Sequence, residues 1–316
     1  LGYPGMNLPE PAMRSIGGAP SVGAVISKIL GSRDGMPAYV WDKVGGSQEP
    51  VQTGWLGGRY APFTPEHSLA KFQRILPEER LHNRMDLLRN LDTFKRELDT
   101  TGNMAAMDAF MQEALNLILS GKIGEALDLS REPEATRKKY LRGATPRWAK
   151  QTERLLLARR LVEHGARYVA LNWGGYLGFD SHDNNYPKMR AILPPFDAAL
   201  AALIEDLYDR GLDKDVLVVA WGEFGRTPTV NEKGGRDHWP AVQSALLIGG
   251  GLKAGQVIGA TDRMAGEVTE RPVHVHEILA TIYRHCGIDP EQTQLIDPQG
   301  RPRYLLDHRK PIAELL

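Results

Sequence analysis

Two apolar runs decide the fold: Tyr168-Val-Ala-Leu-Asn-Trp173 and Val216-Leu-Val-Val-Ala-Trp221. Each run is almost continuously apolar, which is typical of a strand covered on both faces. Residues 152–162 and 196–208, which precede the two runs, have the apolar spacing of helices. A third apolar run spans residues 244–248. This alternation predicts an α/β fold with a mostly parallel sheet flanked by helices.

The part of the chain before this alternation has a different character. Glycine and proline interrupt every element expected near the start, except for one helix that Ser21 caps and Gly31 ends. From 78 to 140 the apolar spacing predicts two or three helices outside the sheet. We therefore expect one structural domain, in which residues 1–145 form a loop-rich and helical cap or insertion and residues 146–316 form the sheet part.

Composition and charge exclude several classes of protein. With 42% hydrophobic residues among 316, the chain can bury a sizeable core. Lys+Arg and Asp+Glu both number 39, so the chain has no net field to attract nucleic acid or an anionic membrane. Cys286 is the single cysteine, and no apolar run approaches the roughly 18 residues of a spanning helix. We expect no internal disulfide, no nucleic-acid partner and no membrane span.

Polar segments adjoin the expected strands. The first run leads into Asp180-Ser-His-Asp-Asn-Asn185, and the second leads into Gly222-Glu-Phe-Gly-Arg-Thr-Pro228. Gly235-Arg-Asp-His-Trp-Pro240 then precedes the third run. Because parallel sheets collect their functional side chains at the carboxyl ends of the strands, we expect all three segments to meet at one edge of the sheet.

Asp180 and His182 lie two residues apart in an expected extended loop. Both side chains can therefore point to the same side while Ser181 points away. A carboxylate and an imidazole presented together suit zinc, iron or manganese. An Asx-turn, in which Asp180 bonds to local backbone and His182 is solvated, explains the same pattern equally well.

Glu223 follows an expected buried strand, between two glycines that allow a ligand to approach the backbone. Its carboxylate can bind a metal or act as a base, and Arg226 can hold an oxyanion through two N–H groups. The alternative is a structural ion pair between Glu223 and Arg226. We favour the functional interpretation, because strand-end loops in this architecture often carry sites.

Arg236, Asp237 and His238 place a guanidinium, a carboxylate and an imidazole in succession. His238 can complete a metal shell, with Asp237 as a further ligand or as the group that orients one. A loop held by an Arg236–Asp237 pair is the competing explanation. Three tryptophans border the polar segments and are either dry walls of a site or ordinary core: Trp173, Trp221 and Trp239.

Other patterns favour structural roles. Gly249-Gly-Gly251 follows a strand, but no helix opens after it, so we predict a turn and not a dinucleotide site. We expect His274 and His276 to diverge at the start of a helix over 275–285, and Cys286 to be a buried small residue. No G-x-S-x-G elbow, P-loop or C-x-x-C pair occurs in the sequence.

Five segments, taken in order, resemble one family. These are Asp180–Asn185, Trp221–Pro228, Gly235–Pro240, Gly249–Gly251 and Gly259-Ala-Thr-Asp262. Together they resemble the domain-of-unknown-function 1501 proteins, which are abundant in planctomycetes and other bacteria and related to the sulfatase and alkaline-phosphatase superfamily. Ser130-Arg-Glu-Pro133 and the closing residues 309–316 fit as well, so the resemblance spans essentially the whole chain.

The resemblance implies an alkaline-phosphatase-like sheet with metal ligands at the strand ends. Asp180 and His182 match the first Asp/His ligand pair of the superfamily, His238 is similar to its late histidine ligand, and Glu223 falls where Asp-His is usual. Phe224 stands where a ligand histidine is expected. We also expect the chain to lack the family's N-terminal part, which carries an export signal and the region of the nucleophile.

The leading hypothesis is therefore a metal-dependent hydrolase of sulfate or phosphate esters, exported to the periplasm or cell envelope and incomplete in this chain. The substrate would be a small anionic ester or a sulfated glycan. A divalent ion (zinc, manganese, calcium or iron) would have four ligands: Asp180, His182, Glu223 and His238. Three residues would serve the reaction: Arg226, Arg236 and Asp237. The alternative is a catalytically inactive, envelope-associated or glycan-binding protein on the same fold.

Overall fold

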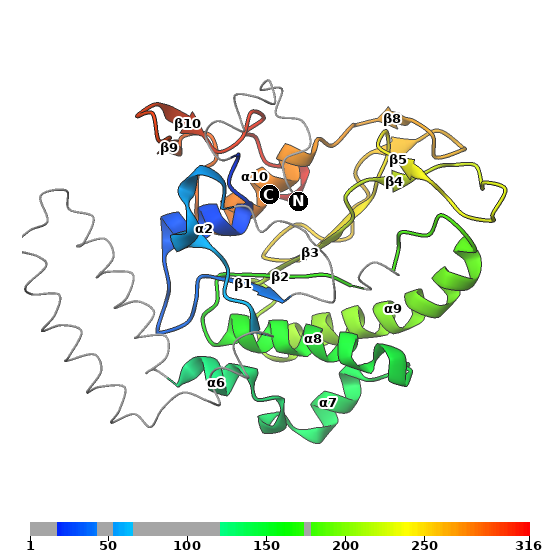
Figure 1. Cartoon of the computed structure of the whole chain (residues 1–316), viewed down its shortest axis with the longest axis horizontal. Coiled ribbons are helices and arrows are strands. Elements are labelled where there is room, and N and C mark those ends of the chain that lie inside the picture. Colours follow the sequence, from blue (N-terminus) through cyan, green and yellow to red (C-terminus); the bar gives the residue numbers. More distant parts are fainter. Residues whose placement is uncertain (1–17, 43–52, 66–120, 174–177) are drawn as a thin grey trace, which may run out of the picture.

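The computed structural model describes residues 18–42, 53–65, 121–173 and 178–316, and these ranges form a mixed α/β fold (Figure 1). Their helices are α2 (Val22–Leu30), α6 (Lys122–Leu127), α7 (Glu134–Tyr140), α8 (Pro146–Glu163), α9 (Asn185–Asp209) and α10 (Val275–His285). Short 3₁₀ turns lie at Gly54–Leu56, Gly58–Tyr60, Leu129–Arg131 and Ala313–Leu315. The helices expected between 78 and 120 lie outside the described residues.

The strands in the same ranges are short. They are β1 (Tyr39–Asp42), β2 (Tyr168–Leu171), β3 (Leu217–Trp221), β4 (Gly225–Arg226), β5 (His238–Trp239), β6 (Ala245–Gly249), β7 (Ala260–Thr261), β8 (Val268–Glu270), β9 (Gln294–Ile296) and β10 (Pro302–Tyr304). The three apolar runs of the sequence correspond to β2, β3 and β6, which confirms them as strands. β1 was not expected, because its four residues lie in a part of the sequence rich in glycine and proline.

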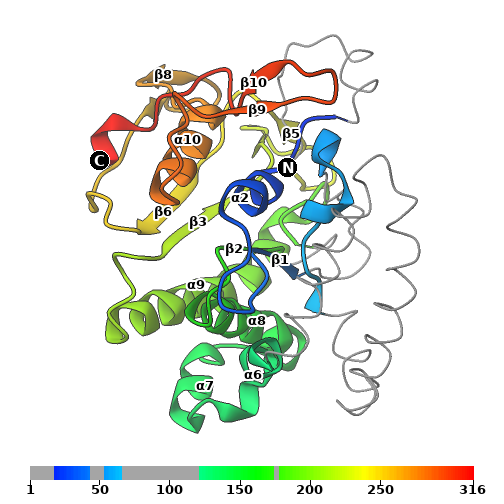
Figure 2. The same cartoon turned by 90° about the vertical axis from the view of Figure 1, so that its left-hand side faces the viewer.

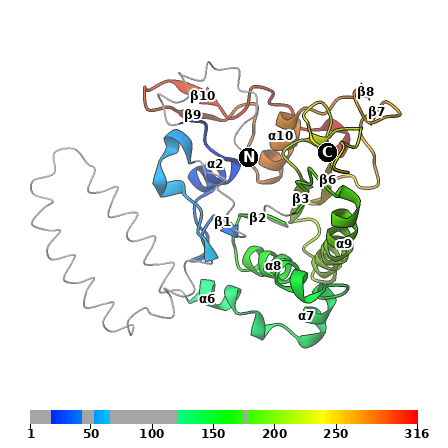
Figure 3. The same ribbon diagram turned by 45° about the vertical axis from the view of Figure 1, so that its right-hand side comes forward.

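The central strands β1, β2 and β3 lie between two layers of helices. α2 and α10 cover one face, and α8 and α9 cover the other (Figures 2 and 3). Along β3, Leu217 and Val219 pack toward α2 and α10, while Val218 packs toward α8 and α9. Alternate side chains of one apolar strand are thus covered on opposite faces, as its sequence predicted.

The prediction of a mostly parallel sheet is wrong for the third apolar run, which pairs antiparallel to its neighbour. Among the described strands, β1 and β2 pair parallel, whereas β3 and β6 pair antiparallel, with Trp221 opposite Ala245. The pairs β4–β5, β7–β8 and β9–β10 are also antiparallel. Parallel neighbours need a crossover, usually a helix, but residues 222–244 contain none. The chain turns back through the β4–β5 hairpin, and the described strands form no large parallel sheet of the alkaline-phosphatase type.

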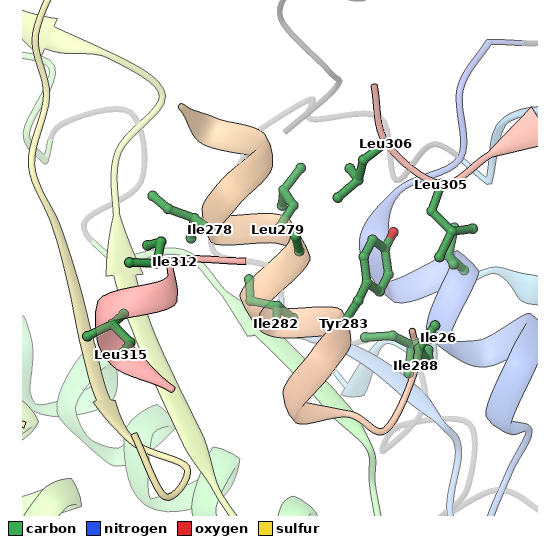
Figure 4. Packing of buried hydrophobic residues seen from close by; sticks show 12 residues of the cluster. Ile26, Ile278, Leu279, Ile282, Tyr283, Ile288, Leu305, Leu306, Ile312 and Leu315 are labelled. Carbon is green, nitrogen blue, oxygen red and sulfur yellow. The ribbon is translucent and has the colours of Figure 1, made fainter. Parts of the chain in front are cut away.

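The largest apolar cluster packs α10 against α2 and the C-terminal segment (Figure 4). Ile26, Tyr283 and Leu306 are all buried there. Burying an aliphatic side chain of this size stabilises the fold by about 1.5–3 kcal/mol. The Ser21 hydroxyl accepts a hydrogen bond from the Ala24 amide and Gly31 ends the helix, which confirms the predicted limits of α2. No described helix is long and apolar enough to cross a membrane.

Both long helices begin earlier than the sequence indicated. α8 begins at Pro146, where a missing N–H costs nothing because the first turn has no intrahelical partner for it. α9 begins at Asn185 and continues through Pro194 and Pro195, which normally break a helix. Its buried face, which includes Pro195 and Ala199, continues across the two prolines. Packing of α9 on α8 therefore outweighs the local cost of the prolines.

The residues assigned structural roles from the sequence have them, with two corrections. Gly249, Gly250 and Gly251 all have positive φ, between 66° and 74°, as a tight turn requires. Cys286 is half-buried and not fully buried as expected, and this burial raises the pKa of its thiol to about 11, which keeps it protonated near neutral pH. His274 and His276 do not diverge: their ring centroids lie 4.7 Å apart. His274 precedes α10 as its N-cap, in extended backbone, so helical spacing does not apply to it.

A buried ion network joins α7, α8 and α9, and the sequence did not reveal it. Arg159 is fully buried and donates to Glu132 at 2.6 Å and to Asp206 at 2.8 Å. Asp206 also accepts from the Tyr140 hydroxyl at 2.9 Å. Burial alone would raise the pKa of Glu132, but hydrogen bonds from Arg159 and Arg160 lower it below the usual range. We call this set the Arg159 network: Glu132, Tyr140, Arg159, Arg160, Glu163, Asp206 and Arg210.

Candidate metal centre

The three polar segments come together as expected, but by a different route. Because β6 runs antiparallel to β3, the residues before β6 lie beside the carboxyl end of β3. The β4–β5 hairpin extends from this point, with Arg226 directly opposite His238. The segment after β2 joins the hairpin loop through an isolated bridge between Asp183 and Gly234. In Figure 1 the hairpin lies above the start of α9.

Two glycines allow the segments to approach backbone to backbone. A Cβ atom at Gly235 would lie 2.0 Å from the carbonyl carbon of His182. A Cβ atom at Gly225 would lie 1.7 Å from the carbonyl oxygen of Val242. Either contact is far inside van der Waals distance, so only glycine permits this crossing of the segments.

Three side chains converge on one point. Asp180 Oδ1 lies 3.0 Å from His182 Nε2 and 3.1 Å from His238 Nε2, and the two Nε2 atoms are 3.2 Å apart. These are the three groups among the described residues whose possible ligand atoms all lie within 4.8 Å of one another. Their side chains are 39–47% exposed, so a solute can reach them. The Asp180 side chain contacts these histidines and Arg226, so it does not act mainly as a local Asx-turn.

Asp237 determines which nitrogen of His182 faces the cluster. The carboxylate lies 2.7 Å from His182 Nδ1, and Asn231 also donates to it. These hydrogen bonds, led by the one with His182, lower the pKa of Asp237, so the carboxylate is ionised and accepts only. His182 Nδ1 must therefore donate, and in the neutral imidazole Nε2 then carries a lone pair.

Asp180 brings a carboxylate to the same point as the two imidazole nitrogens. Partial burial tends to raise the pKa of Asp180, but hydrogen bonds from His238 and Arg226 outweigh it and lower the pKa, so this carboxylate is also ionised. In the neutral tautomer that Asp237 favours, His182 Nε2 faces this carboxylate with a lone pair, and His238 Nε2 lies 3.2 Å from the same nitrogen. A cation between the three atoms would satisfy every lone pair, so this donor set fits a divalent metal.

Glu223 lies beside this cluster but is not part of it. Its carboxylate accepts from Arg226 Nη2 at 3.3 Å, and the other terminal nitrogen of Arg226 donates to Asp180 Oδ1 at 2.6 Å. The ion pair that was the alternative interpretation of Glu223 is therefore present. Glu223 is linked to the cluster through Arg226, and the ligand atoms that converge belong to the other three residues.

Phe224 packs on the cluster from the side of His238. The two ring centroids are 4.2 Å apart, and the Arg226 guanidinium lies 5.6 Å from the Phe224 ring centre. The aromatic ring at this position, where the resemblance led us to expect a histidine, is an apolar support for one imidazole and one guanidinium.

Arg236 holds the loop and does not face the cluster. Its guanidinium donates to the Thr227 carbonyl at 3.1 Å, and its amide donates to the Ser181 carbonyl at 3.0 Å. The Asp237 carboxylate bonds to His182 and Asn231, so the Arg236–Asp237 pair that was the competing explanation is not what orders this segment.

Asn231 was not expected from the sequence. Its side-chain oxygen accepts from the amides of Lys233 and Gly235, and its side-chain nitrogen donates to the His182 carbonyl. An asparagine followed shortly by Gly234-Gly235 is a turn pattern, and that is the one signal that could have identified it.

The hydroxyl groups nearest the cluster are engaged elsewhere. Ser181 is fully buried and donates to Asn185 Oδ1 at 2.5 Å, which confirms that it points away from Asp180 and His182. The Thr227 hydroxyl donates to the Thr229 carbonyl at 2.8 Å. Neither is placed as a nucleophile toward the cluster.

The tryptophans near the strand ends are mainly core. Trp173 stacks on Trp148, with ring centroids 6.4 Å apart, and Trp221 packs against the cluster around α10. The Trp239 indole donates to the Gly266 carbonyl at 2.7 Å. The cluster of Asp180, His182 and His238, whose side chains are 39–47% exposed, is open to water and is not enclosed by these tryptophans.

Comparison with known proteins gives a family and no named activity. A family model described as "Protein of unknown function (DUF1501)" matches residues 5–316. No curated protein and no solved structure gives a match. Since the family model covers nearly the whole chain, this protein belongs to the DUF1501 family.

Proposed function

We propose that this chain is a metal-dependent hydrolase domain that acts on sulfate or phosphate esters. The observation that carries the proposal is the convergence of Asp180 Oδ1, His182 Nε2 and His238 Nε2 on one point that solvent can reach. One carboxylate and two imidazoles are ligands that zinc, iron and manganese accept. When bound, such an ion would supply Lewis acidity toward an ester oxygen.

The surrounding residues have complementary tasks in this proposal. Asp237 holds the Nδ1 proton of His182 and so keeps Nε2 available to the cation. Phe224 supports the ring of His238. Arg226 places a guanidinium beside the cluster, and its paired N–H groups match the oxygens of a sulfate or phosphate group.

A second candidate is an anion-binding protein without turnover. The specific observation in its favour is that the hydroxyls of Ser181 and Thr227 are both engaged in other hydrogen bonds. Such a protein would use the same metal and Arg226 to bind a sulfated glycan or another anionic ester, with neither of these two hydroxyls poised for covalent catalysis.

Metal analysis with matched histidine variants tests the proposal. We expect the protein to retain about one transition-metal ion per chain, and His238→Ala to lower metal affinity on the order of 10-fold or more. His164→Ala is the control, because His164 ends α8 and bonds only to the Arg160 carbonyl. Equal metal affinity in the native protein and in His238→Ala would refute the metal centre.

Turnover separates the two candidates. Release of phenolate from aryl sulfates or aryl phosphates by the metal-loaded protein, lost in His238→Ala, supports the hydrolase. Stoichiometric metal with no turnover on either ester class supports the anion-binding protein instead.

A further inference from the structure

Arg226 donates to the same oxygen on which the two histidines converge. Its Nη1 atom lies 2.6 Å from Asp180 Oδ1, closer than either His182 Nε2 at 3.0 Å or His238 Nε2 at 3.1 Å. We propose that a metal ion displaces Arg226 from Asp180 and that the released guanidinium then binds the anionic group of the ligand. Metal and anion would therefore bind cooperatively. This inference rests on the proposed metal centre.

Arg226 and a metal ion compete for one carboxylate oxygen. The guanidinium and a divalent ion are both positive, so a metal beside Asp180 Oδ1 repels Arg226 as well as replacing it. Without metal, the Arg226 guanidinium donates to Asp180 and supplies positive charge beside this carboxylate. The metal-free protein thus keeps its anion-binding group occupied by its own carboxylate.

The structure also keeps Arg226 next to the site after release. Its second bond, from Nη2 to Glu223 Oε1 at 3.3 Å, does not involve the metal ligands. Its backbone lies in β4 directly opposite His238 in β5, where cross-strand side chains are neighbours. Displacement therefore breaks one of two anchors and leaves Nη1 free beside the cation, where an anionic oxygen would meet both charges.

The decisive measurement is the affinity for Co²⁺ alone, by calorimetry in buffer free of oxyanions. Competition predicts that Arg226→Gln binds Co²⁺ tighter than the native protein, on the order of 10-fold, because a rival cation has been removed. If Arg226 only positions Asp180, the same substitution will weaken Co²⁺ binding. Arg226→Lys keeps a positive charge and should stay much closer to the native affinity.

Inorganic sulfate reports the second half of the proposal. Co²⁺ should raise the affinity of the native protein for sulfate, and by linkage sulfate should raise its affinity for Co²⁺ by the same factor. In Arg226→Gln this factor should fall toward the value set by the metal charge alone. An unchanged factor would overturn the role of Arg226 as the anion-binding group.

A double-mutant cycle with Glu223→Gln distinguishes an anchor from a ligand. If Glu223 acts only by holding Arg226, its substitution will change Co²⁺ affinity in the native background and not in Arg226→Gln. An equal loss in both backgrounds would make Glu223 a metal ligand and contradict the anchoring role. Failure of the native protein and His238→Ala alike to bind Co²⁺ would instead refute the metal centre itself.

Discussion

The candidate metal centre and the Arg159 network place charged and polar side chains in opposite environments. In the network, Arg159 and Glu132 have side chains 0% and 5% exposed, and carboxylate oxygens face guanidinium donors. In the Asp180–His182–His238 cluster, the side chains are 39–47% exposed, and three possible ligand atoms lie within 3.2 Å of one another. Buried charge must be matched because an unpaired buried partner is costly, whereas exposed groups that converge on one point are open to a ligand.

Of the three changes that test this comparison, removal of Arg159 should have the largest effect, and the effect should be on stability. Arg159→Met leaves Glu132 and Asp206 buried without their central donor, so we expect a loss of about 3–5 kcal/mol in the free energy of unfolding. Urea denaturation followed by circular dichroism measures it. Lys138→Ala is the control: its pair with Glu134 is 72% and 70% exposed, and its loss should cost at most about 0.5 kcal/mol. Similar losses in both variants would show that the network is not a stabilising unit.

Removing the charge of Asp237 should affect binding and leave the fold intact. Asp237→Asn can present either its carbonyl or its amide to His182 Nδ1, so the histidine is no longer held in one tautomer. We expect metal affinity to fall about 10- to 100-fold, as for other groups that orient a metal ligand. Co²⁺ titration measures the affinity, and the urea midpoint should stay near the native value. A large loss of stability without a change in metal affinity would show that Asp237 stabilises the fold and does not orient a metal ligand.

A buried carboxylate outside both regions, Asp297, allows the effect of matched buried charge on stability to be tested by changing pH. Asp297, in the β9–β10 turn, is buried and accepts from the amides of Gln299 and Arg301 and from the guanidiniums of Arg301 and Arg303. Burial alone would raise its pKa, but these hydrogen bonds outweigh burial and lower the pKa to about 2.

The sign of the pH effect follows from that lowered pKa. The unfolded chain binds a proton at Asp297 more readily than the folded chain, so this residue contributes stability above about pH 4 and loses that contribution as pH falls toward 2. Asp297→Asn should therefore show a shallower loss of stability over this range than the native protein. Thermal melts from pH 5 to pH 2 measure the effect, which we expect to be the smallest of the three. Parallel curves would contradict the assignment.

Local sequence patterns predicted where several helices, strands and site residues lie. They did not predict which strands and which charged residues pair with one another. The apolar runs located β2, β3 and β6, and the cap at Ser21 located α2. Spacing and strand-end position also led to Asp180, His182 and His238, whose ligand atoms converge. Each of these features is encoded within a few neighbouring residues or follows from a rule about strand ends.

The features that the sequence did not reveal depend on contacts between distant segments. The antiparallel pairing of β6 depends on a chain reversal that only the absence of a helix between the strands indicated. The bond between Arg159 and Glu132 spans 27 residues, and the one between Arg159 and Asp206 spans 47. Nothing in the local pattern of a charged residue says which distant partner will bury it.

The antiparallel pairing of β3 with β6 also determines when, during folding, the Asp180–His182–His238 cluster can form. Its histidines are 56 residues apart, and Asp180 and His238 are 58 apart, with α9 and β3 between them. A newly synthesised chain therefore has no such site until this long loop has closed, which is a slow, late class of folding event. An ion that binds this cluster would therefore bind only the folded chain. At a free ion concentration 100 times the dissociation constant, binding would stabilise the folded state by about 2.7 kcal/mol.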